Sequence, residues 1–164
     1  MERIASFSVD HLKLEPGIYV SRKDQDPATG GVVTTFDIRM TAPNREPVMD
    51  TAAVHALEHL GATYLRNEPD WKDRVLYFGP MGCRTGFYLL MFGDMEPRDV
   101  LPLVTAMFEF IRDYEGDVPG ALPQECGNYH DSDLGMAKWE SRRYLEDTLA
   151  GIDDEHMNYP PLLD

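Results

Sequence analysis

The residues best suited to chemistry lie in one short stretch, His55-Ala56-Leu57-Glu58-His59. Side chains four positions apart stack on one face of an α-helix, so both imidazoles can reach the same metal ion. The Glu58 carboxylate lies between them, where it can move a proton but is poorly placed as a third ligand. The order His-x-x-Glu-His is that of the inverted zincins. The alternative is a pair of helix histidines that only form hydrogen bonds.

The two cysteines of the chain, Cys83 and Cys126, are the candidates to complete such a site. Cys126 lies in a glycine-rich segment ahead of a predicted helix, whose dipole would stabilise a thiolate, and three protein ligands with one open position are typical of catalytic metal sites. Cys83 lies in a predicted turn beside Arg84, so we expect an exposed, reactive thiol that is either a ligand or an acid or base. For both cysteines the alternative is a small, inert apolar residue.

Glu58 and a thiol near one metal would form an acid–base pair, because shared surroundings drive two titratable groups toward different protonation states. Four further residues are weaker candidates, since a single histidine or arginine is more often structural than catalytic. They are His11, Arg39, His130 and His156.

The composition is that of an acidic protein with an ordinary apolar content. The chain has 164 residues, 43% of them hydrophobic and 27% charged, and a formal net charge of −14. We expect one domain over residues 1–164, with an acidic tail from about residue 152. The negative charge argues against nucleic acids and anionic membranes as partners. With no leader-like or membrane-spanning apolar segment and only two cysteines, we expect a cytoplasmic protein.

The hydrophobic pattern predicts strands that alternate with helices. A turn over residues 79–84 separates the last two strands, and Gly116 and Gly151 are expected to end the last two helices. Gly61 within the first helix costs about 1 kcal/mol relative to alanine, so we expect a close packing neighbour there. The pattern indicates an α+β fold, an antiparallel or mixed sheet with helices packed on one face. The predicted strands are residues 32–40, 74–78 and 86–92, and the predicted helices are residues 51–66, about 100–111 and 132–149.

Six segments, in order along nearly the whole chain, resemble the LuxS family of S-ribosylhomocysteine lyases. Any one of them could arise by chance, but six in the right order are highly specific. The resemblance implies the LuxS fold, with an inverzincin-like metal helix. The segments are Ser6-Phe7-Ser8-Val9-Asp10-His11, Phe36-Asp37-Ile38-Arg39, Pro43-Asn44, His55 to Leu60, Pro80 to Phe87 and Glu125-Cys126-Gly127.

The resemblance also implies roles for single residues. His55, His59 and Cys126 match the family's ligands for one divalent metal per subunit, Fe²⁺ in the cell, with Zn²⁺ or Co²⁺ able to replace it. Cys83 and Glu58 match the acid–base pair. The family is a homodimer with its sites at the subunit interface. The implied substrate-binding residues are Ser6, His11, Arg39, Arg66 and, at a position where the family differs, Tyr77.

The implied reaction is the cleavage of S-ribosylhomocysteine. The metal polarises a carbonyl or hydroxyl oxygen of the sugar and makes the neighbouring C–H acidic. Cys83 and Glu58 then move protons, so that the carbonyl migrates from C1 to C2 and on to C3. Homocysteine leaves by β-elimination, and the other product is 4,5-dihydroxy-2,3-pentanedione, the precursor of the quorum signal autoinducer-2.

Two features depart from the family. In its Asp-x-Ser-Pro-Met-Gly-Cys stretch, Tyr77 replaces the aspartate and Gly79 the serine. The segment between His59 and Cys83 is also slightly short. If the family's aspartate holds the homocysteine ammonium group, another group must do so here, and the Tyr77 hydroxyl is a candidate by position. Neither departure affects the metal ligands or the acid–base pair.

Two other functions fit part of the pattern. An inverzincin metallopeptidase would use Glu58 to activate a metal-bound water, but it would have no use for Cys83. A non-enzymatic metal-binding or sensor protein would close its site with a fourth protein ligand, for which His130 or Glu125 is available.

Overall fold

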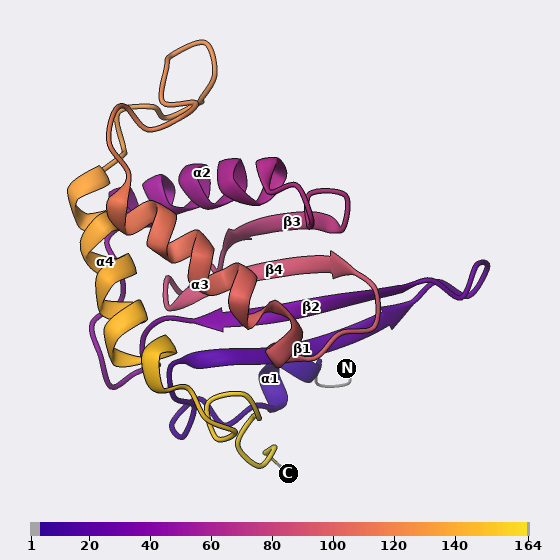
Figure 1. The fold of residues 1–164 in the computed structure, drawn as a ribbon. Coiled ribbons are helices and arrows are strands. Elements are labelled where there is room, and N and C mark those ends of the chain that lie inside the picture. The colour runs from indigo at the N-terminus through magenta and orange to yellow at the C-terminus, as the bar shows by residue number, and fades with distance from the viewer. Residues whose placement is uncertain (1–3, 164) are drawn as a thin grey trace.

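The computed structural model describes residues 4–163, with the side chains of residues 5 and 6 excepted. Its centre is a four-stranded antiparallel sheet in the order β1-β2-β4-β3 (Figure 1). Among the described residues, no helix has both the length and the apolar character needed to cross a membrane. The strands are β1 (Gly17–Gln25), β2 (Val32–Arg39), β3 (Val75–Pro80) and β4 (Gly86–Phe92), and the helices are α1 (Ala5–Ser8), α2 (Thr51–Asn67), α3 (Pro97–Asp113), α4 (Leu134–Asp147) and the 3₁₀ helix η1 (Leu149–Gly151).

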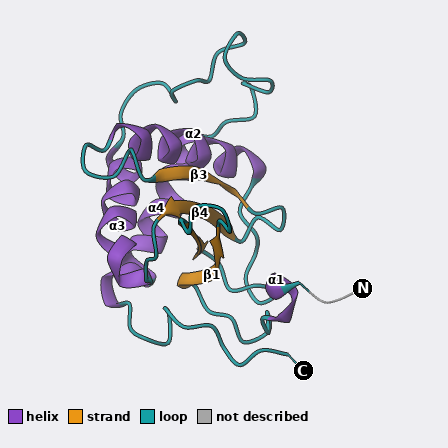
Figure 2. Cartoon of the chain, turned by 90° about the vertical axis from the view of Figure 1, so that its right-hand side faces the viewer, coloured by secondary structure: helices purple, strands orange, loops and turns teal. Residues whose placement is uncertain are grey.

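One face of the sheet is apolar and forms the core. Alternate residues of a strand point to opposite faces, and Ile38 pairs with Ile18 on one side and with Phe87 on the other. These three side chains are fully buried in one hydrophobic cluster that includes residues of α2, α3 and α4. The three long helices lie on this side of the sheet (Figure 2). The predicted α+β class is therefore confirmed, with an antiparallel rather than a mixed sheet.

The opposite face of the sheet is polar. Tyr19, Asp37 and Tyr88 form one row across β1, β2 and β4, because Asp37 pairs with both tyrosines. Arg39 follows on the same face of β2. The short helix α1 lies on this side, away from α3, and the C-terminal segment runs beside it (Figure 2). Within residues 4–163, the polar face is thus covered by short terminal segments rather than by a long helix.

Strand β1 and helix α1 were missed by the sequence-based prediction. Only the first residues of β1 are buried, and its outer half, Ser21–Gln25, is polar and lies in a hairpin that projects from the sheet (Figure 1). A register shift between Val20 and Arg22 also interrupts the alternation. A strand whose outer half faces solvent on both sides lacks the period of two that marks a half-buried strand.

Several ends of helices and strands were predicted wrongly from the sequence. β3 continues into the predicted turn, because Gly79 and Pro80 pair with residues of β4. α3 ends at Asp113, with Tyr114 as C-cap, rather than at Gly116. α4 begins at Leu134 and ends at Asp147. Gly151 lies in the separate helix η1 and therefore does not end α4. The acidic tail after η1 is irregular, as expected.

The close neighbour expected at Gly61 is the ring of Phe78. A Cβ atom at Gly61 would lie 2.5 Å from Phe78 Cε1. Phe78 is 5% exposed and stacks on Phe87, with ring centroids 4.9 Å apart. The absence of a side chain at residue 61 therefore lets α2 approach the sheet closely.

Replacing Gly61 by alanine should lower the free energy of unfolding, although alanine is the better helix former. The gain in helix propensity is about 1 kcal/mol, whereas overpacking a core costs about 1–3 kcal/mol. Because the stacked Phe78 ring cannot move freely, we expect a net loss of up to about 2 kcal/mol in urea unfolding. Gly135→Ala in α4 is the control, since residue 135 is exposed and the nearest neighbour of its Cβ would be the exposed Asp133 side chain, at 3.3 Å, which can move aside. Equal or higher stability of Gly61→Ala would contradict the tight contact.

Candidate active site

Two histidines of α2 and a cysteine of the α3–α4 loop form one group. The Asp50 side chain caps α2 by accepting a hydrogen bond from the Ala52 amide. His55, His59 and Cys126 each offer one ligand atom, and these atoms lie within 4.8 Å of one another. Cys126 Sγ lies 3.3 Å from His55 Nε2. The helical spacing thus places both rings as predicted, and the loop brings the thiol to them.

Backbone carbonyls orient both imidazoles. His55 Nδ1 lies 2.6 Å from the Asp131 carbonyl oxygen, and His59 Nδ1 lies 2.8 Å from that of Pro119. A carbonyl oxygen only accepts hydrogen bonds, so each Nδ1 must carry the proton and each Nε2 keeps its lone pair. Histidine ligands of metals are held in this way. The donor set and its supports therefore fit a divalent metal ion bound by His55, His59 and Cys126.

The loop that supplies these carbonyls could not be predicted from side-chain motifs. Gly120 has a φ of +73°, and a Cβ there would lie 3.0 Å from His59 Nδ1, so glycine suits this close approach. The prediction that the dipole of the following helix stabilises a Cys126 thiolate was wrong, because α4 begins only at Leu134. Instead, the Asn128 amide donates a hydrogen bond to Cys126 Sγ at 3.4 Å.

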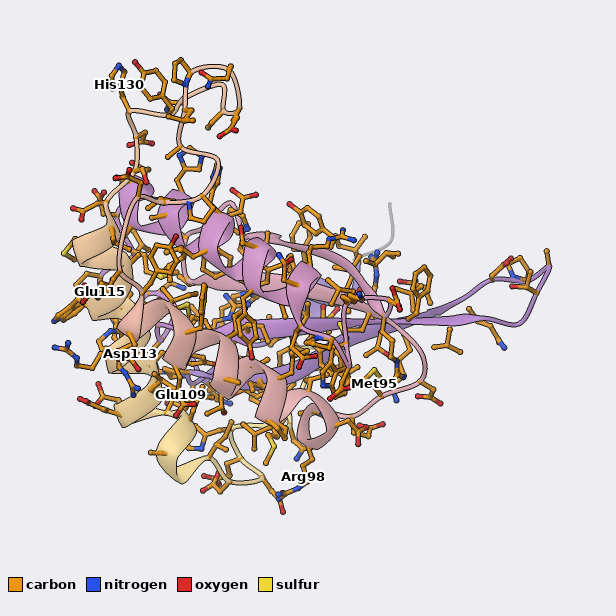
Figure 3. All side chains as sticks on the ribbon, turned by 45° about the horizontal axis from the view of Figure 1, so that its top comes forward. Met95, Arg98, Glu109, Asp113, Glu115 and His130 are labelled. Carbon is orange, nitrogen blue, oxygen red and sulfur yellow. The ribbon has the colours of Figure 1, made fainter. Side chains whose placement is uncertain are left out.

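Neither proposed fourth ligand joins the group. Glu125 and His130 are exposed, and among the described residues the metal-ligating group contains neither. Figure 3 shows His130 at the outer end of the projecting α3–α4 loop. An ion held by these three protein groups would keep a coordination position for a small molecule, as in catalytic metal sites.

A second group surrounds Cys83 on the polar face of the sheet. Cys83 Sγ lies 3.1 Å from Thr85 Oγ1 and 4.0 Å from an Arg39 guanidinium nitrogen. Burial raises the pKa of the thiol, but hydrogen bonds from Thr85 and the charge of Arg39 outweigh it, so the pKa of Cys83 is lowered. The exposed thiol expected at Cys83 is confirmed. The charge that lowers its pKa comes from Arg39 rather than from the expected Arg84.

Arg39 is held by a buried ion pair with Asp37. Its Nε and second terminal nitrogen donate to the two carboxylate oxygens at 3.1 and 2.6 Å, and its other terminal nitrogen donates to Thr85 Oγ1 at 2.5 Å. Arg39 and Asp37 are 3% and 1% exposed. This forked geometry fixes the guanidinium plane and aims one nitrogen at the Cys83–Thr85 pair.

A pocket of about 450 Å³ opens over this second group. Cys83, Arg39 and His11 line it together with Phe7, whereas Glu58 and the three metal ligands do not. His11 Nδ1 is bonded to the Val9 carbonyl oxygen at 2.8 Å. The chain thus presents two groups of candidate residues in separate places.

The remaining predicted residues lie outside both groups. Arg66 donates to the carbonyl oxygens of Val75 and Leu76, so it holds the start of β3. Tyr77 is half exposed and lines a neighbouring pocket of about 420 Å³ on the polar face. Its ring covers Gly79, where a Cβ atom would collide with the tyrosine hydroxyl. Ser6 belongs to α1, but its side chain is outside the described residues.

Comparisons with known proteins agree on one family. The profile of the S-ribosylhomocysteinase (LuxS) family matches residues 4–155. An S-ribosylhomocysteine lyase of Clostridium beijerinckii is 53% identical over 160 residues, which cover 98% of this chain and 99% of the relative. Those of Phocaeicola vulgatus and Finegoldia magna are 54% and 56% identical over 160 residues, covering 98% of this chain and 98% and 99% of the relatives.

Replacing His59 by alanine should abolish tight metal binding. Loss of a residue that merely supports a ligand weakens binding by about 10- to 100-fold, so loss of the ligand itself should exceed that range. Metal content after dialysis, measured by atomic emission, should fall far below that of the unaltered protein. His130→Ala is the control and should keep its ion, whereas metal loss in that variant would indicate a fourth protein ligand.

Replacing Thr85 by valine should make Cys83 less reactive at neutral pH. The variant removes the hydrogen bond to the thiolate, which raises the pKa of Cys83 and lowers the thiolate fraction. A hydrogen bond to a charged group contributes about 1.5–3 kcal/mol, so we expect alkylation by iodoacetamide to slow by about tenfold or more. Thr35→Val is the matched control, because the buried Thr35 hydroxyl has no hydrogen-bond partner among the described residues. An unchanged rate in Thr85→Val would contradict the assigned contact.

Proposed function

The chain belongs to the S-ribosylhomocysteinase (LuxS) family, and we propose how its residues perform the reaction of that family. It is an S-ribosylhomocysteine lyase, an enzyme that cleaves a carbon–sulfur bond. The observation that carries this conclusion is the similarity to lyases over 98% of the chain, at 53% identity in the Clostridium beijerinckii relative. The products are homocysteine and 4,5-dihydroxy-2,3-pentanedione, the precursor of autoinducer-2.

We propose that His55, His59 and Cys126 hold one divalent ion per subunit, Fe²⁺ in the cell, with Zn²⁺ or Co²⁺ able to replace it. Imidazole and thiolate are ligands that suit these metals. When bound, the ion supplies a Lewis acid for an oxygen of the sugar. We propose that α2, which carries the His-x-x-Glu-His motif, resembles the metal-binding helix of the inverzincins.

Cys83 and Glu58 are the proposed acid–base pair. The lowered pKa of Cys83 favours the thiolate, which can take a proton from carbon next to a carbonyl group. Glu58 lies on α2 between the two histidine ligands, where its carboxylate can move protons between sugar oxygens. Repeated transfers bring the carbonyl to C3. Removal of the C4 proton then breaks the C5–S bond and forms a C4=C5 double bond, and the departing sulfur gains a proton to give homocysteine.

The separation of the two groups supports a homodimer. The pocket over Cys83 includes neither Glu58 nor any metal ligand, so one described chain does not assemble the whole site. We propose that two copies pair so that the Cys83 pocket of one faces the metal group of the other. Phe7, which lines this pocket, and Leu12, which follows the lining residue His11, are 68% and 67% exposed and are suited to such a contact.

The proposed substrate contacts come from the polar face. Arg39 and His11 line the Cys83 pocket, and Ser6 precedes the lining residue Phe7. Tyr77 stands at the sequence position of the family's aspartate, and we propose that its hydroxyl contacts the substrate in place of that carboxylate. Arg66, bonded to the backbone of β3, would act by holding that strand as well as through any direct contact.

We also propose where the enzyme acts and how its products are used. We take residues 1–164 as a single lyase domain that acts in the cytoplasm, where the free thiols of Cys83 and Cys126 stay reduced. Its product would serve quorum sensing, and homocysteine would return to the methyl cycle. The acidic surface gives no reason to expect nucleic acid or membrane partners. Similarity to lyases over nearly the full chain disfavours the metallopeptidase and metal-sensor alternatives.

Replacing Cys83 by alanine should stop homocysteine release without loss of metal. Removing a general acid–base residue lowers a rate by about 10²- to 10⁴-fold, so we expect a fall of at least about 100-fold. Thiol release from S-ribosylhomocysteine by anaerobic, Fe²⁺-loaded protein measures this. Gly135→Ala, outside both groups, should retain full activity. Release by a folded, metallated Cys83→Ala protein would refute the role of the thiol, and no release by the unaltered enzyme would refute the lyase.

A further inference from the structure

The C-terminal segment is irregular, yet it is anchored across the polar side of the sheet. The His156 carbonyl oxygen accepts a hydrogen bond from the Ile18 amide at 2.9 Å. A Cβ at Gly17 would collide with that oxygen, so glycine allows the segment to lie this close. The Leu163 amide donates to the Ser8 carbonyl oxygen at 2.7 Å. We call residues 156–163 the C-terminal strap.

Tyr159 is the residue of the strap that reaches the active-site face. Its ring stacks on Tyr19, with centroids 4.8 Å apart and planes 10° apart. Its hydroxyl donates to Asp37 Oδ2 at 2.8 Å. Burial and the charge of Asp37 raise the pKa of Tyr159 well above its usual value, so the hydroxyl keeps its proton and remains a donor.

A continuous set of hydrogen bonds leads from this hydroxyl to the Cys83 thiol. Asp37 Oδ2 accepts from both Tyr159 and Arg39, which fixes the carboxylate from two sides. Arg39 donates to Thr85 Oγ1 and thereby occupies a lone pair of that hydroxyl. The Thr85 proton is then directed to Cys83 Sγ, 3.1 Å away, where it stabilises the thiolate. Each step depends on the orientation of the one before.

We infer that Tyr159 is a positioning residue for Cys83, acting through Asp37, Arg39 and Thr85. The inference rests on the proposed acid–base role of Cys83 and adds to it a strap residue that touches neither the thiol nor its pocket. The strap also pairs Leu162 with Val9, close to His11, and so holds the N-terminal segment that lines the same pocket. A segment outside the two candidate groups thereby sets the state of the thiol.

Other charged or titratable groups face Cys83, and the test must leave them unchanged. His11 comes from the N-terminal segment, Glu46 from the loop after β2, and Tyr88 from β4, and all three line the pocket with Arg39. Arg84 adjoins Cys83 in the chain. Tyr159→Phe alters none of these side chains and keeps the ring that stacks on Tyr19.

The experiment is the pH profile of Cys83 alkylation in the metal-loaded protein without substrate. Peptide mass spectrometry separates Cys83 from Cys126. In Tyr159→Phe the midpoint should move to higher pH and the rate at neutral pH should fall by about threefold, because a smaller fraction of the thiol is ionised. Tyr19→Phe is the matched control, since it removes a hydroxyl from the partner ring that bonds to the Glu15 carbonyl oxygen rather than to Asp37. Its profile should match that of the unaltered protein.

A second comparison tests the route. In a Thr85→Val background, adding Tyr159→Phe should cause a much smaller further shift, because the Thr85 donor is gone and only the longer contact of Arg39 with Cys83, at 4.0 Å, remains. An unchanged profile in Tyr159→Phe, an equal shift in Tyr19→Phe, or a full further shift in the Thr85→Val background would each overturn the inference. The readout needs no turnover, so it is independent of whether the protein releases homocysteine.

Discussion

The buried ion pair between Asp37 and Arg39 is the interaction on which the chemistry of the polar face depends. Taking two charges out of water is costly, and removing one partner of such a pair is strongly destabilising. The pair lies at the C-terminal end of β2, where Arg39 pairs with Gly86 at the start of β4. Because Asp37 fixes the guanidinium group of Arg39, Arg39 can donate to Thr85 and contact Cys83 at the β3–β4 turn.

The metal group is built on a different principle. α2 sets the spacing of two proposed ligands through helical geometry alone, and a long loop without regular structure supplies the third proposed ligand and both carbonyls bonded to the imidazoles. The loop is itself fixed to α2, since the Asp133 amide donates to the Ala52 carbonyl oxygen. The placement of the two imidazoles and their orientation therefore come from separate elements of the fold.

What the sequence predicted well was local. The His-x-x-Glu-His spacing, the strand over residues 32–40 and the close packing expected at Gly61 all follow from local sequence patterns. What it missed depends on tertiary contact. A backbone carbonyl that orients a histidine, such as that of Pro119, cannot be recognised from the residue type. The charge beside Cys83 comes from Arg39 rather than from the sequence neighbour Arg84. β1 lacked a pattern because half of it projects into solvent.

The contact between Tyr77 and Gly79 has a consequence for how such a sequence can change. The tyrosine hydroxyl occupies the space of a side chain at residue 79. Any side chain at residue 79 would force the half-exposed Tyr77 ring into another position. A substitution of Gly79 therefore changes the surface that Tyr77 presents on β3, the edge strand of the sheet, without altering residue 77 itself.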